Sequence, residues 1–287
     1  MSDLPPLREV IARHELGAKK SLGQHFLLDL NITRKIARAA GIQPGDIVLE
    51  IGPGPGGLTR VLLEAGARVC AVERDRRCVA ALEELAVAFP GGLQVIEADA
   101  LKLDERTISG FAPPVKIVAN LPYNISTELL IKWLRANCCG PPLWSSMSLM
   151  FQKEVADRIL AAPGSKTYGR LSVIAQAASA PSRAFDLPAR AFTPPPKVGS
   201  SVLVFSPAAE PLADFAALER VTAAAFGQRR KMLRSSLRPV FGERLGDVLR
   251  STGVPETARA EDIEVGCFVA LALGANFGDI AAGGCTP

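Results

Sequence analysis

The stretch DIVLEIGPGPGGLTRVLLEAGARVCAVERD, residues 46–75, decides the fold. A short apolar run, IVLEI at 47–51, leads into a glycine-rich turn. A helix-length segment then separates it from a second apolar run, RVCAVE at 68–73. Short apolar runs bounded by turn residues are typical of buried strands. The stretch therefore predicts a strand, a crossover helix and a second strand parallel to the first.

The same alternation continues along the chain. Three further apolar runs follow at helix-length intervals: LQVIEA at 93–98, KIVAN at 116–120 and SMSLMF at 146–151. This rhythm predicts an α/β fold with a mostly parallel sheet. Two later runs, SRAFDL at 182–187 and SSVLVF at 200–205, flank a proline-rich segment and are also predicted to be strands.

A change of pattern after residue 207 predicts a second domain. The segment PAAEP at 207–211 reads as a linker, and the patterned segments beyond it, 214–237, 243–251 and 261–274, all have helical spacing. We therefore expect an α/β domain over 1–207 and a small all-helical domain over 208–287. The first domain includes a basic leader, in which Asp29 or Asn31 is expected to cap a helix that ends at Gly41.

Composition excludes several classes of protein. The chain has 287 residues, of which 48% are hydrophobic, and no apolar stretch is long enough to cross a bilayer. The N-terminus carries charges where a secretory signal needs an apolar core, so we expect a soluble, cytoplasmic protein. Nothing in the sequence resembles a dimer seam, so we expect a monomer. Six cysteines without framework spacing and only two histidines argue against disulfides, a metal site and a serine-histidine triad. A net charge of +4 means that nucleic-acid binding has to be argued from local clusters.

The glycine-rich turn has the spacing of a nucleotide-binding loop. Gly52, Gly54 and Gly57 follow a strand and precede a helix in a G-x-G-x-x-G pattern. Taken alone, the pattern equally fits glycines that only form a tight turn between strand and helix.

The residues around these glycines favour S-adenosylmethionine over a dinucleotide. Pro53 and Pro55 remove two backbone donors from a loop that would otherwise have to bind a pyrophosphate. Glu50, two residues before the first glycine, would repel phosphates but would attract a ligand that carries an ammonium and a sulfonium group. S-adenosylmethionine is such a ligand.

Two acidic residues end the next two predicted strands. Glu73 lies about 20 residues after Gly52, where an acidic side chain commonly accepts the ribose hydroxyls of a nucleoside. Asp99 ends the third predicted strand and is placed to accept a hydrogen bond from the adenine amine of the cofactor. Each acid alone could be a solvated charge at a strand end. Because ligands bind at the carboxyl ends of parallel strands, the two together favour a nucleoside site.

The tetrad Asn120-Leu121-Pro122-Tyr123 follows the fourth predicted strand and should face the same crevice. The nitrogen of an adenine amine is a poor nucleophile because its lone pair is delocalised into the ring. If the Asn120 side-chain oxygen and the Leu121 carbonyl accept the two amine hydrogens, the lone pair is held toward the methyl group. Pro122 makes the corner rigid, and Tyr123 offers a ring on which the base stacks. The alternative is a strand-to-helix turn with a capping Asn and a core Tyr.

These motifs resemble the KsgA-type ribosomal RNA adenine dimethyltransferases over nearly the full length. The resemblance rests on KSLGQHFL, EIGPGPGGLT, NLPYNIST, QKEVADRI, YGRLSV and FTPPPKVGSSV. It implies a Rossmann-like class I methyltransferase sheet with a small helical RNA-binding domain. It also implies transfer of methyl groups from S-adenosylmethionine, which becomes S-adenosylhomocysteine, to N6 of two adjacent adenosines near the 3′ end of small-subunit rRNA.

The resemblance also assigns roles to individual residues. It implies that His25 and Leu27 line the cofactor pocket, and that Phe192 of FTPPPKV forms a second wall against the target base. The remaining implied cofactor residues are Glu50, Gly52, Gly54, Glu73, Asp99 and Asn120.

A basic cluster in the second predicted domain is a candidate RNA contact. Arg230, Arg234 and Arg238 are spaced to share one face of a helix. Arg229 and Lys231 flank them, and Lys197, Arg170, Lys19 and Lys20 could extend the track. A solvated charged face would have the same pattern.

Two rival functions stay open at this point. A DNA adenine methyltransferase or an erythromycin-resistance methylase of large-subunit rRNA would share the glycine loop and a similar tetrad. The chain could also act mainly as an assembly factor that binds the immature small ribosomal subunit.

Overall fold

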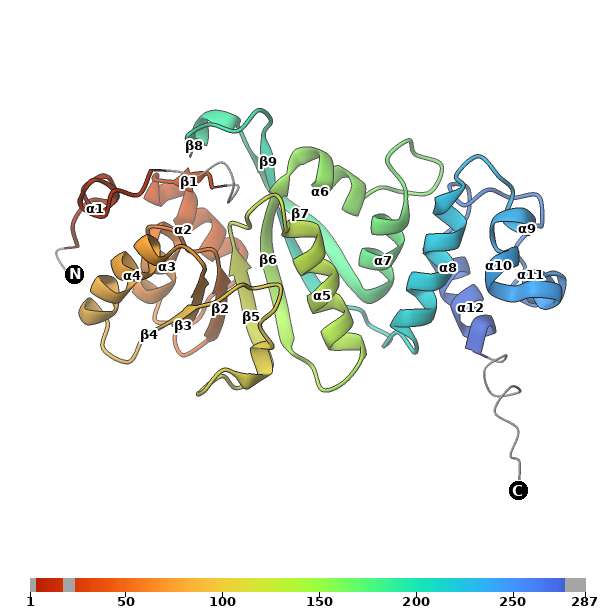
Figure 1. Ribbon diagram of the computed structural model, residues 1–287, viewed down its shortest axis with the longest axis horizontal. Helices are drawn as coiled ribbons and strands as arrows, with labels where there is room; N and C mark the ends of the chain where they lie inside the picture. Colours follow the sequence, from red (N-terminus) through yellow and green to blue (C-terminus); the bar gives the residue numbers. More distant parts are fainter. Residues whose placement is uncertain (1–3, 18–23, 277–287) are drawn as a thin grey trace, which may run out of the picture. The chain divides into compact units, whose positions relative to one another are not determined.

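The computed structural model describes residues 4–17 and 24–276. The chain forms two compact units. Figure 1 shows its helices and strands coloured along the sequence. The first unit comprises 1–133, 142–156 and 182–206, and the second comprises 134–141, 157–181 and 207–287. A boundary was expected after residue 207, and the second unit does resume at Pro207. It also takes in 134–141 and 157–181, so these units divide the chain differently from the predicted boundary.

The described residues form a seven-stranded sheet in the order β4-β3-β2-β5-β6-β9-β7. Neighbouring strands from β4 to β6 are parallel, and β9 runs antiparallel to β6. The α/β fold with a mostly parallel sheet is thus confirmed. The strands are β2 (Ile47–Ile51), β3 (Arg68–Glu73), β4 (Leu93–Glu97), β5 (Val115–Ala119), β6 (Trp144–Gln152), β7 (Ser179–Leu187) and β9 (Ser200–Pro207).

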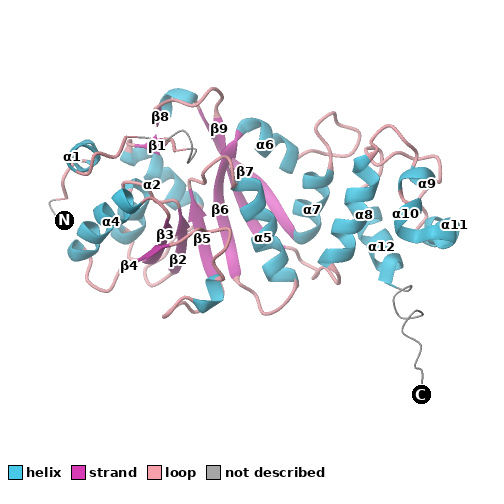
Figure 2. Ribbon diagram, viewed as in Figure 1, coloured by secondary structure: helices cyan, strands magenta, loops and turns pink. Residues whose placement is uncertain are grey.

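Helices connect the parallel strands, and α3 and α4 lie beside β3 (Figure 2). The leader helix begins as one of the two expected caps predicts, because the Asp29 side chain accepts a hydrogen bond from the Asn31 amide at 2.8 Å. Of the helices described, none is long and apolar enough to cross a membrane. The helices before β7 are α1 (Leu7–Arg13), α2 (Leu30–Ala39), α3 (Gly57–Glu64), α4 (Arg76–Ala88), α5 (Ser126–Cys138), α6 (Lys153–Ile159) and α7 (Arg170–Ala178).

A second, two-stranded sheet was not predicted. β1 (Phe26–Leu27) pairs antiparallel with β8 (Phe192–Thr193). Two-residue strands have no periodicity, and these two are far apart in sequence, so only the folded chain reveals the pair. The pairing brings the proline-rich segment beside the leader residues that follow Gln24.

The second unit contains α7 and the helices that follow β9. Helix α8 contacts both α7 and α12, and the rings of Phe226 and Phe268 stack at 5.4 Å. Tyr168, just before α7, donates its buried hydroxyl to the Ile263 carbonyl at 3.0 Å. These contacts explain why 157–181 belongs to the second unit. The later helices are α8 (Phe215–Gly227), α9 (Leu233–Ser236), α10 (Arg238–Phe241), α11 (Leu245–Ser251) and α12 (Val265–Asn276).

The expected helix over 214–237 is interrupted. Helix α8 ends at Gly227, and the amides of Leu233 and Arg234 bond to the carbonyls of Ala258 and Glu256 instead of continuing the helix. Met232 forms an isolated antiparallel bridge with Arg259. Long-range backbone hydrogen bonds therefore override the local helical pattern.

Candidate active site

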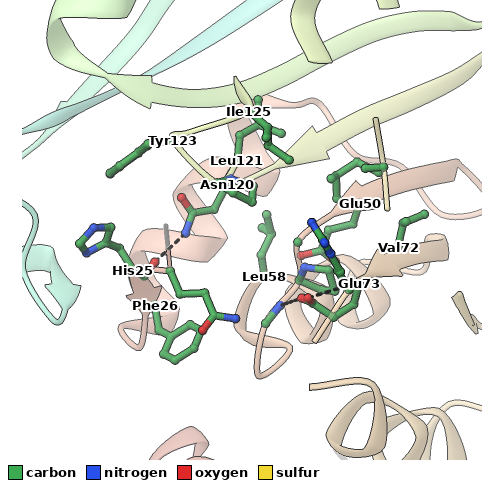
Figure 3. A pocket seen from close by; sticks show the side chains of 18 of the residues that line it. His25, Phe26, Glu50, Leu58, Val72, Glu73, Asn120, Leu121, Tyr123 and Ile125 are labelled. Atoms are coloured by element: carbon green, nitrogen blue, oxygen red, sulfur yellow. Dashed lines mark hydrogen bonds between the residues drawn. The ribbon is translucent and has the colours of Figure 1, made fainter. Parts of the chain in front are cut away.

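One pocket of the first unit collects residues from the carboxyl ends of four parallel strands (Figure 3). The loops after β2, β3, β4 and β5 line it together with the leader strand β1. This is the edge at which open α/β sheets bind ligands. The lining residues are Gln24, His25, Phe26, Leu27, Glu50, Ile51, Gly52, Pro53, Gly54, Pro55, Gly57, Leu58, Val72, Glu73, Arg74, Ala98, Asp99, Ala100, Leu101, Asn120, Leu121, Pro122, Tyr123, Asn124 and Ile125.

The glycine loop needs glycine on steric grounds. Gly52 and Gly54 have positive φ angles of 65° and 56°, which side chains of L-residues rarely adopt. A Cβ atom at Gly54 would also lie 3.0 Å from the Phe26 ring, and one at Gly57 would lie 2.8 Å from the Leu27 carbonyl oxygen. The loop therefore turns tightly, lies against β1 and leaves its backbone open to the pocket.

Glu50 is a buried carboxyl group that lacks a complete set of partners. The residue is 1% exposed, and its Oε2 atom has no hydrogen-bond partner among the described residues. Burial raises the pKa of Glu50 to about 8, so the unliganded site holds a protonated acid at neutral pH. A cationic ligand group beside it would favour the carboxylate and satisfy the unpaired oxygen. An ammonium group fits this requirement.

Glu73 ties the glycine loop to the end of β3. Its Oε1 accepts hydrogen bonds from the amides of Arg74 and Asp75, both at 2.8 Å, and its Oε2 accepts from the Gly54 amide at 3.1 Å. Burial raises the pKa of Glu73, and these three bonds to the carboxylate act in the opposite direction. A carboxylate has about four acceptor positions, so the protein uses most of them and leaves room for one ribose hydroxyl. Both hydroxyls were expected to bind here.

Asp99 is the second residue after β4. Its Oδ1 accepts a hydrogen bond from the Leu101 amide at 3.1 Å, and its Oδ2 lies 3.5 Å from the guanidinium of Arg74. The carboxylate keeps acceptor capacity toward the pocket and can take the adenine amine of a nucleoside.

The orientation of Asn120 is set by the leader. Its Nδ2 donates to the His25 carbonyl at 3.1 Å, which leaves Oδ1 as the free end of the amide. No described residue donates to Asn120 Oδ1. Leu121 is buried, yet its carbonyl likewise accepts no hydrogen bond from the described residues. Both residues line the pocket, so the tetrad offers two acceptors, the number that a primary amine with two hydrogens requires.

His25 and Tyr123 lie next to each other at the rim. Their ring centroids are 5.4 Å apart with the planes tilted by 30° (Figure 3). His25 donates from Nδ1 to the Pro194 carbonyl at 2.7 Å, because a carbonyl only accepts. The Tyr123 hydroxyl lies 2.6 Å from the Ser200 hydroxyl. Burial raises the pKa of Tyr123, so its phenol stays protonated at neutral pH.

Phe192 does not face this pocket. It is 2% exposed, pairs with Leu27 across β1 and β8, and belongs to the hydrophobic core. A second stacking wall formed by Phe192 therefore stays a prediction, which this buried placement does not support. Its partner Leu27 lines the pocket, whereas Phe192 itself packs in the core.

The basic cluster is split between different environments. Arg229 pairs with Glu261 at 2.6 Å and donates to the Lys166 carbonyl at 2.9 Å, so it serves the internal structure of the second unit. The other members, Arg230, Lys231, Arg234 and Arg238, are exposed but do not share one helix face, because 228–232 is not helical. Lys197 is exposed in the first unit. Arg170 lies 3.5 Å from Glu219, and Lys19 and Lys20 lie outside the described residues.

The site fits S-adenosylmethionine on its own features. The unpaired Glu50 oxygen, the glycine loop in which a Cβ would clash, and the acceptors at Glu73 and Asp99 match an ammonium, a close backbone approach and a nucleoside. A metal site lacks material, since no group of three His, Cys, Asp or Glu side chains gathers within the described chain. Sequence reasoning missed Phe26, Arg74 and Leu101, whose only signal was their position next to predicted site residues.

Comparison with known proteins agrees with this site. The family model described as ribosomal RNA adenine dimethylase matches residues 16–275. "Ribosomal RNA small subunit methyltransferase A" of Ruegeria sp. (strain TM1040) is 56% identical over 275 residues, covering 95% of this chain and 97% of the relative. The protein of the same name from Xanthobacter autotrophicus is 59% identical over 274 residues, covering 95% and 94%.

Two solved structures have the same architecture. A dimethyladenosine transferase from Plasmodium falciparum has a TM-score of 0.75 at 28% identity, covering 88% of this chain and 98% of the other. The 23S rRNA methyltransferase ErmE has a TM-score of 0.64 at 26% identity, covering 88% and 99%. The fold is that of S-adenosylmethionine-dependent methyltransferases, and the chain belongs to the ribosomal RNA adenine dimethylase family.

Proposed function

We propose that the protein dimethylates N6 of two adjacent adenosines near the 3′ end of small-subunit (16S) rRNA, as a step in small-subunit biogenesis. The observation that carries the proposal is the tetrad after β5. There the free Oδ1 of Asn120 and the Leu121 carbonyl present two acceptors to one pocket.

The two acceptors make an adenine amine reactive. S-adenosylmethionine supplies an electrophilic methyl group when it is bound. Asn120 Oδ1 and the Leu121 carbonyl accept the two amine hydrogens, which orients the nitrogen lone pair and stabilises the positive charge that grows on it. A strong base is unnecessary, since the proton can leave after the bond has formed. Pro122 fixes the corner, and the Tyr123 ring supports the base, a contact worth about 1 to 3 kcal/mol.

Three acidic residues would bind different groups of the cofactor. Glu50 pairs with the ammonium group, Glu73 accepts a ribose hydroxyl, and Asp99 accepts from the adenine amine. The walls of the same pocket come from His25, Leu27, Gly52 and Gly54.

RNA binding is proposed for the segment 208–287. The exposed side chains of Arg230, Lys231, Arg234 and Arg238 would contact phosphates, and so would the exposed Lys197 of the first unit. Such contacts position the RNA without reading its sequence. We further propose that the protein acts as a monomer in the cytoplasm.

Two alternatives differ in the substrate. ErmE, a 23S rRNA methyltransferase, shares the fold at 26% identity, whereas the relatives at 56% and 59% identity are named for the small subunit. The much higher identity favours small-subunit rRNA. A mainly docking assembly factor would not need two unsatisfied acceptors in the tetrad.

The test supplies methyl-labelled S-adenosylmethionine with unmethylated small-subunit particles, large-subunit RNA or duplex DNA, followed by nucleoside mass analysis. Dimethyladenosine from small-subunit particles alone, abolished by Asn120→Ala, is the expected result. Label in large-subunit RNA would refute the proposed substrate. Tight particle binding without any label would refute the proposed reaction.

A further inference from the structure

Ser200, the first residue of β9, contacts the tetrad from a different part of the chain. Its hydroxyl lies 2.6 Å from the hydroxyl of Tyr123, and the residue is fully buried. Ser200 is not among the residues that line the pocket, whereas Tyr123 is. Any effect it has on the reaction must pass through Tyr123.

The two partners differ in how firmly the backbone holds them. Ser200 stands opposite Gln152 in the antiparallel pairing of β9 with β6, and β9 lies between β6 and the edge strand β7. Tyr123 lies in the turn between β5 and α5, where its carbonyl accepts a hydrogen bond from the Ser126 hydroxyl at 3.1 Å. A ring attached through two side-chain torsions is fixed when its far end is bonded to a rigid group. The His25 ring contacts it as well, at 5.4 Å.

We propose that Ser200 is a positioning residue that fixes the plane of the Tyr123 ring, and that it matters most for the second methyl transfer. This inference rests on the proposed dimethylation of adenine N6.

The second transfer should depend more on Tyr123 because the amine nitrogen then carries one hydrogen fewer. Each transfer replaces one N6–H bond by an N6–CH3 bond and releases one proton, with S-adenosylhomocysteine as the other product. The unmodified amine offers two hydrogens to Asn120 Oδ1 and the Leu121 carbonyl, but the monomethylated amine offers only one. Orientation of the monomethylated base therefore depends more on its contact with the Tyr123 ring.

The neighbouring residue provides a matched control. Ser201 is equally buried and donates its hydroxyl to Asp186 at 2.7 Å, and successive strand residues point to opposite faces. Ser201→Ala thus removes a buried strand hydroxyl of the same kind without touching Tyr123.

The experiment compares wild type, Ser200→Ala, Ser201→Ala, Tyr123→Phe and the Ser200→Ala/Tyr123→Phe double variant. We expect Ser200→Ala and Tyr123→Phe each to raise the share of monomethyladenosine among released products about three- to tenfold, and the double variant to add nothing further. Ser201→Ala should keep the wild-type ratio at a similar loss of Tm. Additive effects, or a wild-type ratio in Ser200→Ala, would overturn the inference.

An independent readout separates this inference from the proposed function. The chain has only two tyrosines, Tyr123 and Tyr168, so selective ring labelling gives two sets of NMR signals. We expect Ser200→Ala to shift or sharpen the Tyr123 signals through faster ring motion, while Ser201→Ala leaves them unchanged. Unaltered Tyr123 signals in Ser200→Ala refute the positioning role whether or not the enzyme is active. If the wild type is inactive but Ser200→Ala still alters the Tyr123 signals, the proposed reaction is refuted and the positioning role is not.

Discussion

Replacing Glu50 by Gln should stabilise the cofactor-free protein, and the gain should grow with pH. Glu50 is 1% exposed, and burial raises its pKa from 4.5 to about 8. Between these values the native state keeps a proton that the unfolded chain has lost. Because stability rises with pH only where the unfolded state binds more protons, the wild type loses stability across this window.

The size of the loss follows from the two pKa values. The pKa of Glu50 is 4.5 in the unfolded chain and about 8 in the native state. This difference lowers the free energy of unfolding by about 1 kcal/mol at pH 5 and by about 3 kcal/mol at pH 7. Gln has nearly the same shape and does not ionise, so it escapes this loss. The stability difference between Glu50→Gln and wild type should therefore increase by about 2 kcal/mol from pH 5 to pH 7.

Urea unfolding at pH 5, 6 and 7 measures this difference. Tryptophan fluorescence reports on the correct unit, since Trp133 and Trp144 both belong to the first unit. Glu83→Gln, at an exposed position of α4, serves as the control and should show no pH-dependent difference. A stability difference for Glu50→Gln that stays constant over the three pH values would refute the reasoning. Calorimetry should also show weaker S-adenosylmethionine binding to Glu50→Gln.

Three further predictions concern the loop, the tetrad and the basic cluster. Gly54→Ala should lower Tm and cofactor affinity, since its Cβ would lie 3.0 Å from Phe26 at a φ of 56°; unchanged calorimetric binding would contradict this. Asn120→Ala should lower kcat on the order of 10²- to 10³-fold at saturating cofactor, and a near-normal rate of dimethyladenosine formation would exclude its role. Arg229→Ala should lower Tm, because it loses the ion pair with Glu261. Arg230→Ala should instead weaken RNA binding and reduce the slope of log K against log salt concentration by about one. A lower Tm for Arg230→Ala together with weaker RNA binding for Arg229→Ala would contradict this assignment.

The strand-end residues could be located from sequence because each depends on local information only. An apolar run predicts a strand, and in a parallel sheet the carboxyl ends of all strands lie at the same edge. The polar residue that follows each strand therefore lies at that edge. Glu73, Asp99 and Asn120 all lie at the pocket for this reason. Burial was not predictable in the same way. Glu50 was expected to be a carboxylate, whereas its complete burial makes it a protonated acid at neutral pH.

The features that were not predicted share a different cause, which is contact between segments distant in sequence. Phe192 is buried because β8 pairs with a leader strand, and Arg230, Arg234 and Arg238 do not share a helix because residues 256–258 bond the amides of Leu233 and Arg234. Neither contact leaves a periodic trace in the sequence.

The catalytic geometry itself depends on such contacts. Asn120 presents its oxygen because its amide nitrogen bonds to the His25 carbonyl, and Tyr123 is held by Ser200. One partner comes from before the sheet and the other from its antiparallel strand, so both can be correct only after the whole first unit has folded. Sequence therefore predicts which groups line the pocket, while their orientation is a property of the folded unit. It follows that substitutions at Ser200, outside the pocket, should change product distribution without changing cofactor affinity.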